Sequence, residues 1–378
     1  MCEVVKTLDM GGVEVLLVER LRQSRKRNNR YTVVCMRAAT GELIEQLEDL
    51  GVHVVDLGSR ARLLACARLV TTVRRLAPDV LNVHSPLPAF ILRPFVRLGR
   101  RRPVMVSTVH YIRDDLLRAR RPDALLGRVT TRASTFLDCL TRRLDDQIVA
   151  VSSRVARSST RGARPVLTRV HGVDVAEQRF WAERRDAVRH EFAVPEGAFL
   201  VVCVANFRPE KNHSLLVQAA ARVLLTRADA VFLLVGDGPL REQVARDIDR
   251  HGVGGQVRIL GRVPRAKRLV AAADLVVLSS LHEALPVVVM EALAAGVPVV
   301  STEVGGIGEL VHSGRNGILT DPRSSGALAA GILEAMEPAT HRRLRGGANA
   351  GSATVDMAGT AEWFEDLYEE LARTTRHL

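Results

Sequence analysis

Residues 278–306 read LSSLHEALPVVVMEALAAGVPVVSTEVGG. This stretch predicts, in order, the end of a strand, a short loop, a helix, a tight turn, a second strand and a Gly-Gly turn. Both strands are continuous apolar runs, which is typical of parallel strands that helices cover on both faces. The stretch therefore predicts one strand–helix–strand unit of an α/β fold.

The same alternation of β-branched runs and helical patterns continues along the whole chain of 378 residues. It forms two series, whose expected strands are 3–8, 31–36, 53–57, 80–84, 104–110 and 147–151, then 199–205, 231–235, 256–260, 275–279 and 297–301. Two such series predict two doubly wound α/β domains. The length agrees, since one domain usually takes roughly 100–200 residues.

We place the first domain at residues 1–180 and the second at residues 190–355. The boundary follows Gly172-Val173-Asp174, because residues 175–197 are polar and have no strand character. Residues 360–378 carry apolar side chains at helical spacing and predict an amphipathic C-terminal helix.

Composition excludes several classes of protein. Apolar residues make up 47% of the chain and charged residues 25%, which excludes a disordered chain, a collagen and a coiled-coil rod. No run approaches roughly 18 uncharged apolar residues, and no basic-then-apolar signal pattern opens the sequence, so a membrane-spanning chain is not expected. The five cysteines lie far apart without a C-x-x-C pair. They indicate reduced thiols in a cytoplasmic protein rather than disulfides or a metal site.

The formal net charge of +12 comes from the first half of the chain. Residues 51–132 hold 16 Lys and Arg against 5 Asp and Glu. This asymmetry indicates an acidic partner, which could be a phosphorylated acceptor, a membrane surface or a nucleic acid.

Two glutamates flank the start of the helix predicted in the opening stretch. Pro286 fits the first helical position, because it lacks the N–H that would have no partner there. Glu283 then lies in the loop before the helix and Glu291 inside the helix. The N–H groups of Ala284 and Leu285, together with the positive end of the helix dipole, suit a phosphate or diphosphate. An ordinary strand-to-helix connection with two solvated glutamates fits the spacing equally well.

Two further loops follow predicted strands. Arg208 and Lys211 come after the strand that ends at Ala205, at the edge where open α/β sheets bind ligands, and two cations there could neutralise a diphosphate leaving group. Gly236 opens a Gly-Asp-Gly-Pro turn that lets backbone approach a ligand. Taken singly, the first loop is better explained as a surface turn with a salt bridge, and the second meets no dinucleotide fingerprint.

In this order the three loops resemble those of the retaining nucleotide-sugar glycosyltransferases of family four, which have two Rossmann-like domains facing across a cleft. Other matching segments are 8–14, 150–152, 170–174 and 260–262. The resemblance covers nearly the whole chain and is most specific over 275–306. It implies a GT-B type fold whose C-terminal helix crosses back to the first domain.

The resemblance also implies roles for single residues. Glu283 would contact the donor sugar or its transferring carbon, and His110, at the end of a first-domain strand, would face the reacting sugar. These two are the candidate catalytic residues. From its position alone, His110 is better explained as a buried core histidine. The candidate donor-binding residues are Gly12, Arg208, Lys211, Gly236, Arg262, Ala284, Leu285 and Glu291, of which Glu291 would hold the ribose.

Three positions depart from the family pattern. Asn206 stands where the family usually has an arginine, and we expect Arg208 to take over the phosphate contact. His171 stands where the family usually has an asparagine. Only eight residues precede the loop that begins at Asp9, so the first strand is short.

The family therefore implies a glycosyltransferase in a bacterial cell that uses no resident cofactor. We expect a UDP-sugar donor first and GDP-mannose next, and a hydroxyl acceptor on an envelope lipid, a polysaccharide or a small metabolite. Fixed cations would replace a metal ion, since no Asp-x-Asp motif is placed for one. The alternatives are a sugar-nucleotide epimerase of the same architecture and a basic nucleic-acid-binding protein. Aromatic residues are only 4% of the chain, so we expect no nucleic-acid partner.

Two predicted helices, 60–76 and 89–102, carry apolar side chains flanked by arginines. Helices of this kind lie on anionic bilayers. They also occur packed on a sheet with a solvated arginine face. We expect a cytoplasmic protein whose first domain contacts the inner face of the membrane through these helices.

Overall fold

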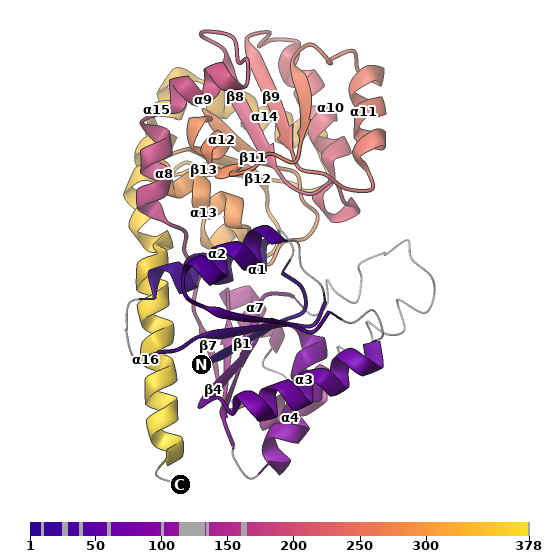
Figure 1. Cartoon of the computed structure of the whole chain (residues 1–378). Helices are drawn as coiled ribbons and strands as arrows, with labels where there is room; N and C mark the ends of the chain where they lie inside the picture. The colour runs from indigo at the N-terminus through magenta and orange to yellow at the C-terminus, as the bar shows by residue number, and fades with distance from the viewer. Residues whose placement is uncertain are drawn as a thin grey trace. The chain divides into compact units, whose positions relative to one another are not determined.

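The computed structural model describes residues 1–8, 11–24, 29–37, 41–58, 62–99, 102–112, 133, 136–159 and 165–376. The chain divides into two compact units (Figure 1). The first unit comprises Met1–Gly172 and Met357–Leu378, and the second comprises Val173–Asp356.

The first unit is built on a parallel sheet whose described strands have the order β3-β2-β1-β4-β5-β6-β7. The strands are β1 (Cys2–Val5), β2 (Thr32–Cys35), β3 (His53–Asp56), β4 (Val80–Val83), β5 (Val104–Val109), β6 (Gln147–Ala150) and β7 (Val166–Thr168). The helices are α1 (Gly12–Gln23), α2 (Gly41–Asp49), α3 (Arg62–Leu76), α4 (Pro86–Leu98), α7 (Ser153–Ser159) and α16 (Met357–Arg376), with a short 3-10 turn, η1 (Arg142–Leu144).

Alternate strand residues of this sheet pack against different helices. Val4, Leu81 and Met105 share a core with α3 and α4. The residues of the opposite face pack on α1 and α2 at one side and on α16 at the other. Because helices cover both faces, the strands are apolar at nearly every position, as their sequences indicate.

The second unit has a parallel sheet with the described order β10-β9-β8-β11-β12-β13. Its strands are β8 (Phe199–Val204), β9 (Ala230–Val235), β10 (Val257–Gly261), β11 (Leu275–Leu278), β12 (Val299–Thr302) and β13 (Gly317–Thr320). Its helices are α8 (Val175–Ala182), α9 (Arg185–Glu191), α10 (His213–Leu224), α11 (Arg241–Arg250), α12 (Lys267–Ala272), α13 (Val287–Ala294), α14 (Ser325–Met336) and α15 (Pro338–Gly351). Short 3-10 turns are η2 (Pro209–Lys211), η3 (Ile307–Glu309) and η4 (Ser352–Val355).

The division between the units falls after Gly172, whereas the sequence places the end of the first domain at residue 180. The reason is α8, which packs on α12 and α13 of the second sheet. The helix α16, in contrast, belongs to the first unit, because its Phe364, Leu367 and Tyr368 lie in one core with β4, β5 and β6. None of the helices in the described ranges is both long and apolar enough to cross a bilayer.

Candidate active site

The strand order of the second sheet reverses between β8 and β11. Open α/β sheets bind ligands in the crevice that such a reversal leaves at the carboxyl ends of the strands. The loop after β8 carries Lys211 and the loop after β11 carries Glu283. Both candidate residues therefore lie at the place where this architecture binds ligands.

The structure brings these two side chains into contact. Lys211 Nζ donates to Glu283 Oε1 at 2.5 Å, and Ser280 Oγ donates to the same oxygen at 2.7 Å. The two loops are also joined through backbone atoms, since Ser279 Oγ donates to the Lys211 carbonyl at 2.9 Å. The Lys211 side chain remains 24% exposed and that of Glu283 8% exposed, so the ion pair is open to a ligand on the lysine side.

The helix after Glu283 begins one residue later than the sequence predicts. Pro286 is the N-cap of α13, with φ −76° and ψ 122°, and the helix starts at Val287. Ala284 and Leu285 therefore lie before the cap, and the Ala284 carbonyl accepts a hydrogen bond from the Gly306 N–H at 3.0 Å. Glu291 lies half-buried inside α13, as predicted.

A Gly-Gly turn holds the Glu283 loop in place. Gly305 has φ +60°, and a Cβ atom built there would lie 1.5 Å from the carbonyl oxygen of Glu283. The loop can therefore adopt this path only because residue 305 has no side chain.

Gly236 joins the loops that follow β8, β9 and β10. Its N–H donates to the Gly261 carbonyl at 2.8 Å, and a Cβ atom there would lie 2.1 Å from the Ala205 carbonyl oxygen. The neighbouring Asp237 carbonyl accepts from the N–H of Phe207 at 3.0 Å. The sequence motifs around residues 206, 236 and 261 thus meet at one edge of the sheet.

The side chains of the two candidate arginines, Arg208 and Arg262, are more exposed than those of Lys211 and Glu283. Arg262 is 76% exposed, and its Nε lies 4.0 Å from Asp237 Oδ2. Arg208 is exposed, as is Asn206. The Lys211 N–H donates to the Arg208 carbonyl at 3.0 Å, but within the described ranges no hydrogen bond or ion pair links the Arg208 guanidinium to Lys211 or Glu283.

The first sheet also reverses its strand order, between β1 and β4. Gly12 opens α1 after β1 and is exposed, whereas Asp9 and Met10 of the same loop lie outside the described residues. His110 follows β5 directly and is half-buried, with its ring centroid 5.2 Å from those of both His84 and His171.

A buried carboxylate behind His110 was not foreseen from the sequence. Glu3 of β1 has no exposed surface, and its two oxygens face four donors. Arg20 Nη2 lies 2.7 Å and the Tyr368 hydroxyl 3.0 Å from Oε1. His84 Nε2 lies 2.7 Å and Asn82 Nδ2 3.0 Å from Oε2. Glu3, Asn82 and Thr108 each interrupt a mostly apolar strand, and this shared pattern could have indicated a buried polar cluster.

Burial and charge set the protonation of this cluster. Burial opposes ionisation of Glu3, but the Arg20 guanidinium and the hydrogen bond with His84 outweigh it and lower the pKa of the carboxyl to about 2. Burial, together with His171 and His84, holds the pKa of His110 well below its usual range. Burial also lowers the pKa of His171 to about 3, with Arg20 and His84 acting in the same direction.

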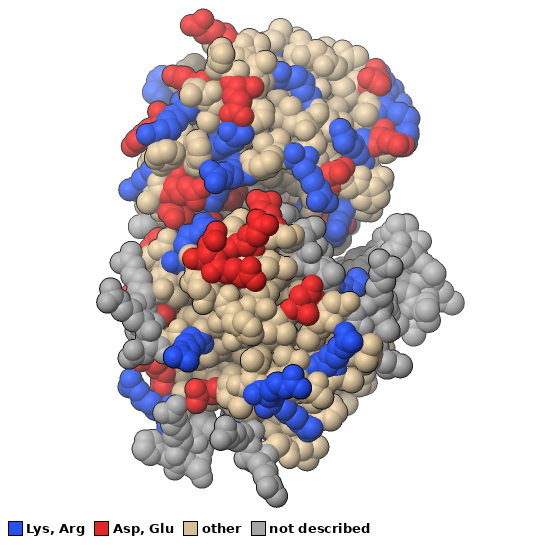
Figure 2. Space-filling model, in the orientation of Figure 1, with Lys and Arg blue, Asp and Glu red and all other residues tan. Residues whose placement is uncertain are grey.

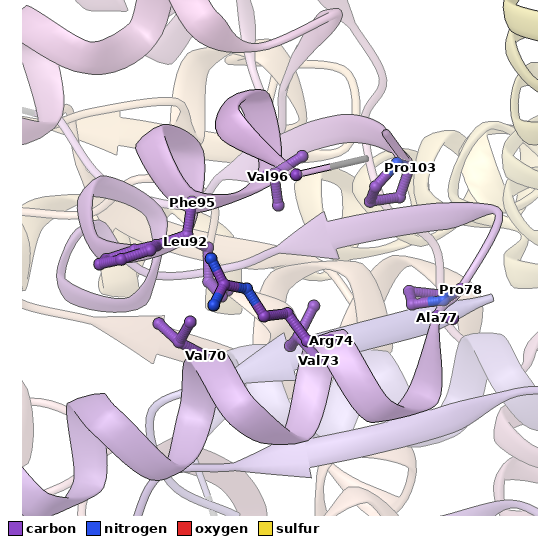
Figure 3. Close-up of a pocket in the computed structure, with 10 residues that line it drawn as sticks. Val70, Val73, Arg74, Ala77, Pro78, Leu92, Phe95, Val96 and Pro103 are labelled. Carbon is purple, nitrogen blue, oxygen red and sulfur yellow. The ribbon is translucent and has the colours of Figure 1, made fainter. Parts of the chain in front are cut away.

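A pocket of about 380 Å³ lies between α3 and α4 of the first unit (Figure 3). Its walls are apolar apart from Arg74, whose guanidinium lies 5.5 Å from the centre of the Phe95 ring. The other lining residues are Val70, Val73, Ala77, Pro78, Leu92, Val96, Gly99 and Pro103. The two helices are those for which the sequence predicts contact with a membrane, although residues 60, 61, 100 and 101 and the side chains of residues 62 and 63 lie outside the described residues.

Comparison with known proteins identifies the class. Residues 184–350 match the family model described as glycosyl transferases group 1, and residues 10–177 match the one described as glycosyltransferase family 4. The crystal structure of HepE from Anabaena in complex with UDP has a TM-score of 0.81 at 22% identity, covering 98% of this chain and 99% of HepE.

Two curated relatives align over most of this chain. N-acetyl-alpha-D-glucosaminyl L-malate synthase of Bacillus anthracis is 26% identical over 267 residues, which is 68% of this chain and 65% of that protein. D-inositol 3-phosphate glycosyltransferase of Streptosporangium roseum is 29% identical over 258 residues, or 62% of this chain and 59% of that protein. The chain thus spans less than two thirds of the length of these two relatives.

The two parallel α/β units have the GT-B type fold that the sequence predicts. The chain belongs to the group 1 glycosyltransferases related to family four, and it is a transferase enzyme.

The close approach at Gly305 gives a stability prediction. Gly305→Ala should lower the free energy of unfolding by several kcal/mol, because the Cβ atom would displace the backbone of Glu283 as well as strain a positive φ. Gly314→Ala is the control, since Gly314 has φ +78° with nothing within 4 Å of the added Cβ, and it should cost only about 1–2 kcal/mol. Urea unfolding measures both. Equal losses would contradict the proposed constraint.

His171 should make the first unit sensitive to acid. A histidine whose folded pKa is about 3 instead of 6.5 takes up a proton first in the unfolded state, so stability falls as the pH falls below 6.5. Between pH 7 and pH 5 the loss due to His171 is roughly 2 kcal/mol. His171→Asn should remove this part of the loss, whereas substitution of the exposed His251 by Asn should not.

Fluorescence can follow the first unit alone. The chain has two tryptophans, and Trp363 is the one that lies in the first unit. Urea unfolding in a Trp181→Phe background at pH 7 and pH 5 therefore reports on the surroundings of His171. An unchanged pH dependence in His171→Asn would show that folding does not lower the pKa of His171.

Proposed function

We propose that this enzyme transfers a sugar from a nucleoside diphosphate donor to a hydroxyl acceptor with retention of the anomeric configuration. The observation that carries the proposal is the contact between Lys211 and Glu283 at the reversal point of the second sheet. A cation and a carboxylate at one point match the two charges that develop when a glycosyl phosphate bond breaks.

The leaving diphosphate gains negative charge in the transition state, and the sugar gains oxocarbenium character. Lys211 would bind the diphosphate with its partly exposed ammonium group, and Glu283 would face the sugar. Ser280 and Lys211 both donate to Oε1 of Glu283, so Oε2 is the oxygen that lacks a partner among the described residues. This oxygen would be the one that contacts the donor sugar.

We propose that fixed cations of the chain replace a metal ion in this reaction. Lys211 supplies one positive charge at the site, and the exposed Arg208 on the same loop can supply a second when it turns toward the diphosphate. The start of α13 adds the N–H groups of its first turn. No resident cofactor is needed, because the sugar nucleotide is itself the activated substrate.

A UDP-sugar is the donor that we propose first. The likeness to HepE, whose structure holds UDP, supports this choice. For the acceptor, the net charge of +12 favours a hydroxyl compound that carries negative charge. The names of the Bacillus and Streptosporangium relatives point the same way, since malate and inositol 3-phosphate are both anionic hydroxyl compounds.

We also propose that the enzyme is a cytoplasmic protein whose first unit touches an anionic membrane through α3 and α4. The exposed Arg74 and Arg75 of α3 and the exposed Phe95 and Leu98 of α4 support this contact. Figure 2 shows blue side chains over α3. The pocket beside Arg74 offers room for part of an acyl chain (Figure 3).

Not every arginine of these helices is available for a membrane. Arg93 is buried and binds both Asp138 and Asp145 at 2.7 Å, which corrects the expectation that it belongs to a solvated basic face. Arg97 pairs with Asp146 at 2.7 Å. The membrane contact that we propose therefore depends on α3 for its charge and on α4 for its apolar residues.

Nucleotide binding tests the donor site. UDP at about 100 times its dissociation constant should stabilise the wild type by ~2.7 kcal/mol, and Lys211→Ala should lose most of this effect. Lys267→Ala is a matched control, since Lys267 is also ion-paired at 2.5 Å, to Glu177, in the same unit. Thermal unfolding with UDP, GDP, ADP and TDP measures the effect and ranks the bases.

Activity gives the second half of this test. Release of UDP from UDP-glucose should fall ~10²–10³-fold in Lys211→Ala, as is usual when one electrostatic contact to a transition state is lost. A glycosylated product excludes the epimerase alternative, and the anomeric form of the product tests retention. Wild-type activity in Lys211→Ala would overturn the assigned site.

Vesicle binding tests the membrane contact. The wild type should sediment with vesicles of phosphatidylglycerol at low salt, and Leu98→Glu should weaken this binding about tenfold or more, since it removes a leucine from the bilayer and adds a repelled charge. Leu225→Glu is the control, because Leu225 of the second unit is 85% exposed and Leu98 is 84% exposed. Equal effects of the two substitutions, or no sedimentation of the wild type, would refute the contact.

A further inference from the structure

Three neighbouring strands place a chain of polar side chains on one buried face of the first sheet. β1 pairs with β4 and β4 pairs with β5, so Glu3 lies beside Asn82, and His84 and His110 follow on the same face. His84 Nε2 lies 2.7 Å from Glu3 Oε2, and His84 Nδ1 lies 3.0 Å from His110 Nε2. A continuous hydrogen-bonded path therefore leads from the buried carboxylate to the half-buried His110.

The charges of Glu3 and His84 together determine the direction of the hydrogen bonds along this path. An ionised carboxylate only accepts, so His84 Nε2 must carry a proton and donate it. Arg20 already supplies the positive charge that balances Glu3, so we infer a neutral His84, whose bare Nδ1 accepts from the Nε2–H of His110. His110 is neutral as well, so its Nδ1 carries no proton and can accept a hydrogen bond from a hydroxyl group.

The carboxylate at the start of the path is itself held firmly. Arg20 lies 2.7 Å from Oε1 and keeps Glu3 ionised, and the Tyr368 hydroxyl of α16 donates to the same oxygen. Asn82 donates to Oε2 and accepts from the Thr108 hydroxyl at 2.9 Å. Because both oxygens of Glu3 are held by these neighbours, the ring of His84 has one preferred orientation, and its hydrogen bond in turn orients the ring of His110.

We infer that Glu3 and His84 are positioning residues for His110, fixing its Nε2–H tautomer so that Nδ1 accepts a hydrogen bond from a hydroxyl of the transferring sugar. This inference rests on the proposed function and on the role that the family resemblance implies for His110, which is to face the reacting sugar. The chain supplies its own orienting carboxylate for that histidine, on the first strand of the first sheet. Buried carboxylates that orient a functional histidine in this way are a recurring device in enzymes.

The tautomer can be measured in the free protein without any substrate. Nitrogen-15 spectra of the imidazole rings, assigned with His110→Ala, should show the proton of His110 on Nε2 and a bare Nδ1 between pH 7 and pH 8. In His84→Phe, which removes the acceptor while keeping a ring, His110 should populate both tautomers. A proton on Nδ1 of His110 in the wild type would overturn the inference.

Kinetics test whether this orientation matters for transfer. His84→Phe should lower kcat roughly 10- to 100-fold, with a smaller change in the donor KM. His341→Phe is the control, because His341 of the second unit also makes a ring hydrogen bond, to the Asp274 carbonyl at 2.9 Å, and it should leave kcat unchanged.

A double-substitution cycle separates positioning from general damage to the fold. The combination His84→Phe with His110→Ala should be no slower than His110→Ala alone, since His84 acts through His110. Multiplying losses, or full activity in His110→Ala, would overturn the inference. Absence of sugar transfer by the wild type would instead defeat the proposed function, and the tautomer measurement would still decide whether Glu3 and His84 orient His110.

Discussion

The reversal of strand order in each parallel sheet is the constraint on which the rest of the structure depends. At the reversal, neighbouring strands send their connections to opposite faces, so the loops at their carboxyl ends separate and leave room for a ligand. In the second unit this point brings Lys211 and Glu283 together, and in the first it adjoins Gly12 and His84. Residues far apart in the sequence meet there because the strand order brings the carboxyl ends of their strands side by side.

The ion pairs Glu3–Arg20 and Lys211–Glu283 differ in how far they are buried. The Glu3–Arg20 pair is wholly buried, and its cost of desolvation is offset by four donors to one carboxylate, so it orients its neighbours and stays fixed. The Lys211–Glu283 pair keeps part of the lysine in solvent. The ammonium group of Lys211 therefore stays accessible from solvent, unlike the guanidinium of Arg20.

Much of the fold and part of the site can be predicted from the sequence. The apolar runs predict most strands, but β7 and β13 are missed, because Val166–Thr168 has only three residues and Gly317–Thr320 holds only two apolar side chains beside its glycine. Glu283 and Lys211 are both predicted from their loops, yet their contact joins positions 72 apart and needs the sheet topology. The sequence likewise predicts Arg93 as a surface cation, because its pairing with Asp138 and Asp145 in the core joins distant positions and needs the fold.

The helix α16 has a consequence for the order in which the protein can mature during synthesis. The first unit needs Phe364 and Tyr368 to close its core and to bond Glu3, but these residues emerge from the ribosome only after the entire second unit. The second unit is contiguous in sequence and can fold as soon as it is made. Translation thus yields a complete second unit while the first unit still lacks the helix that closes its core.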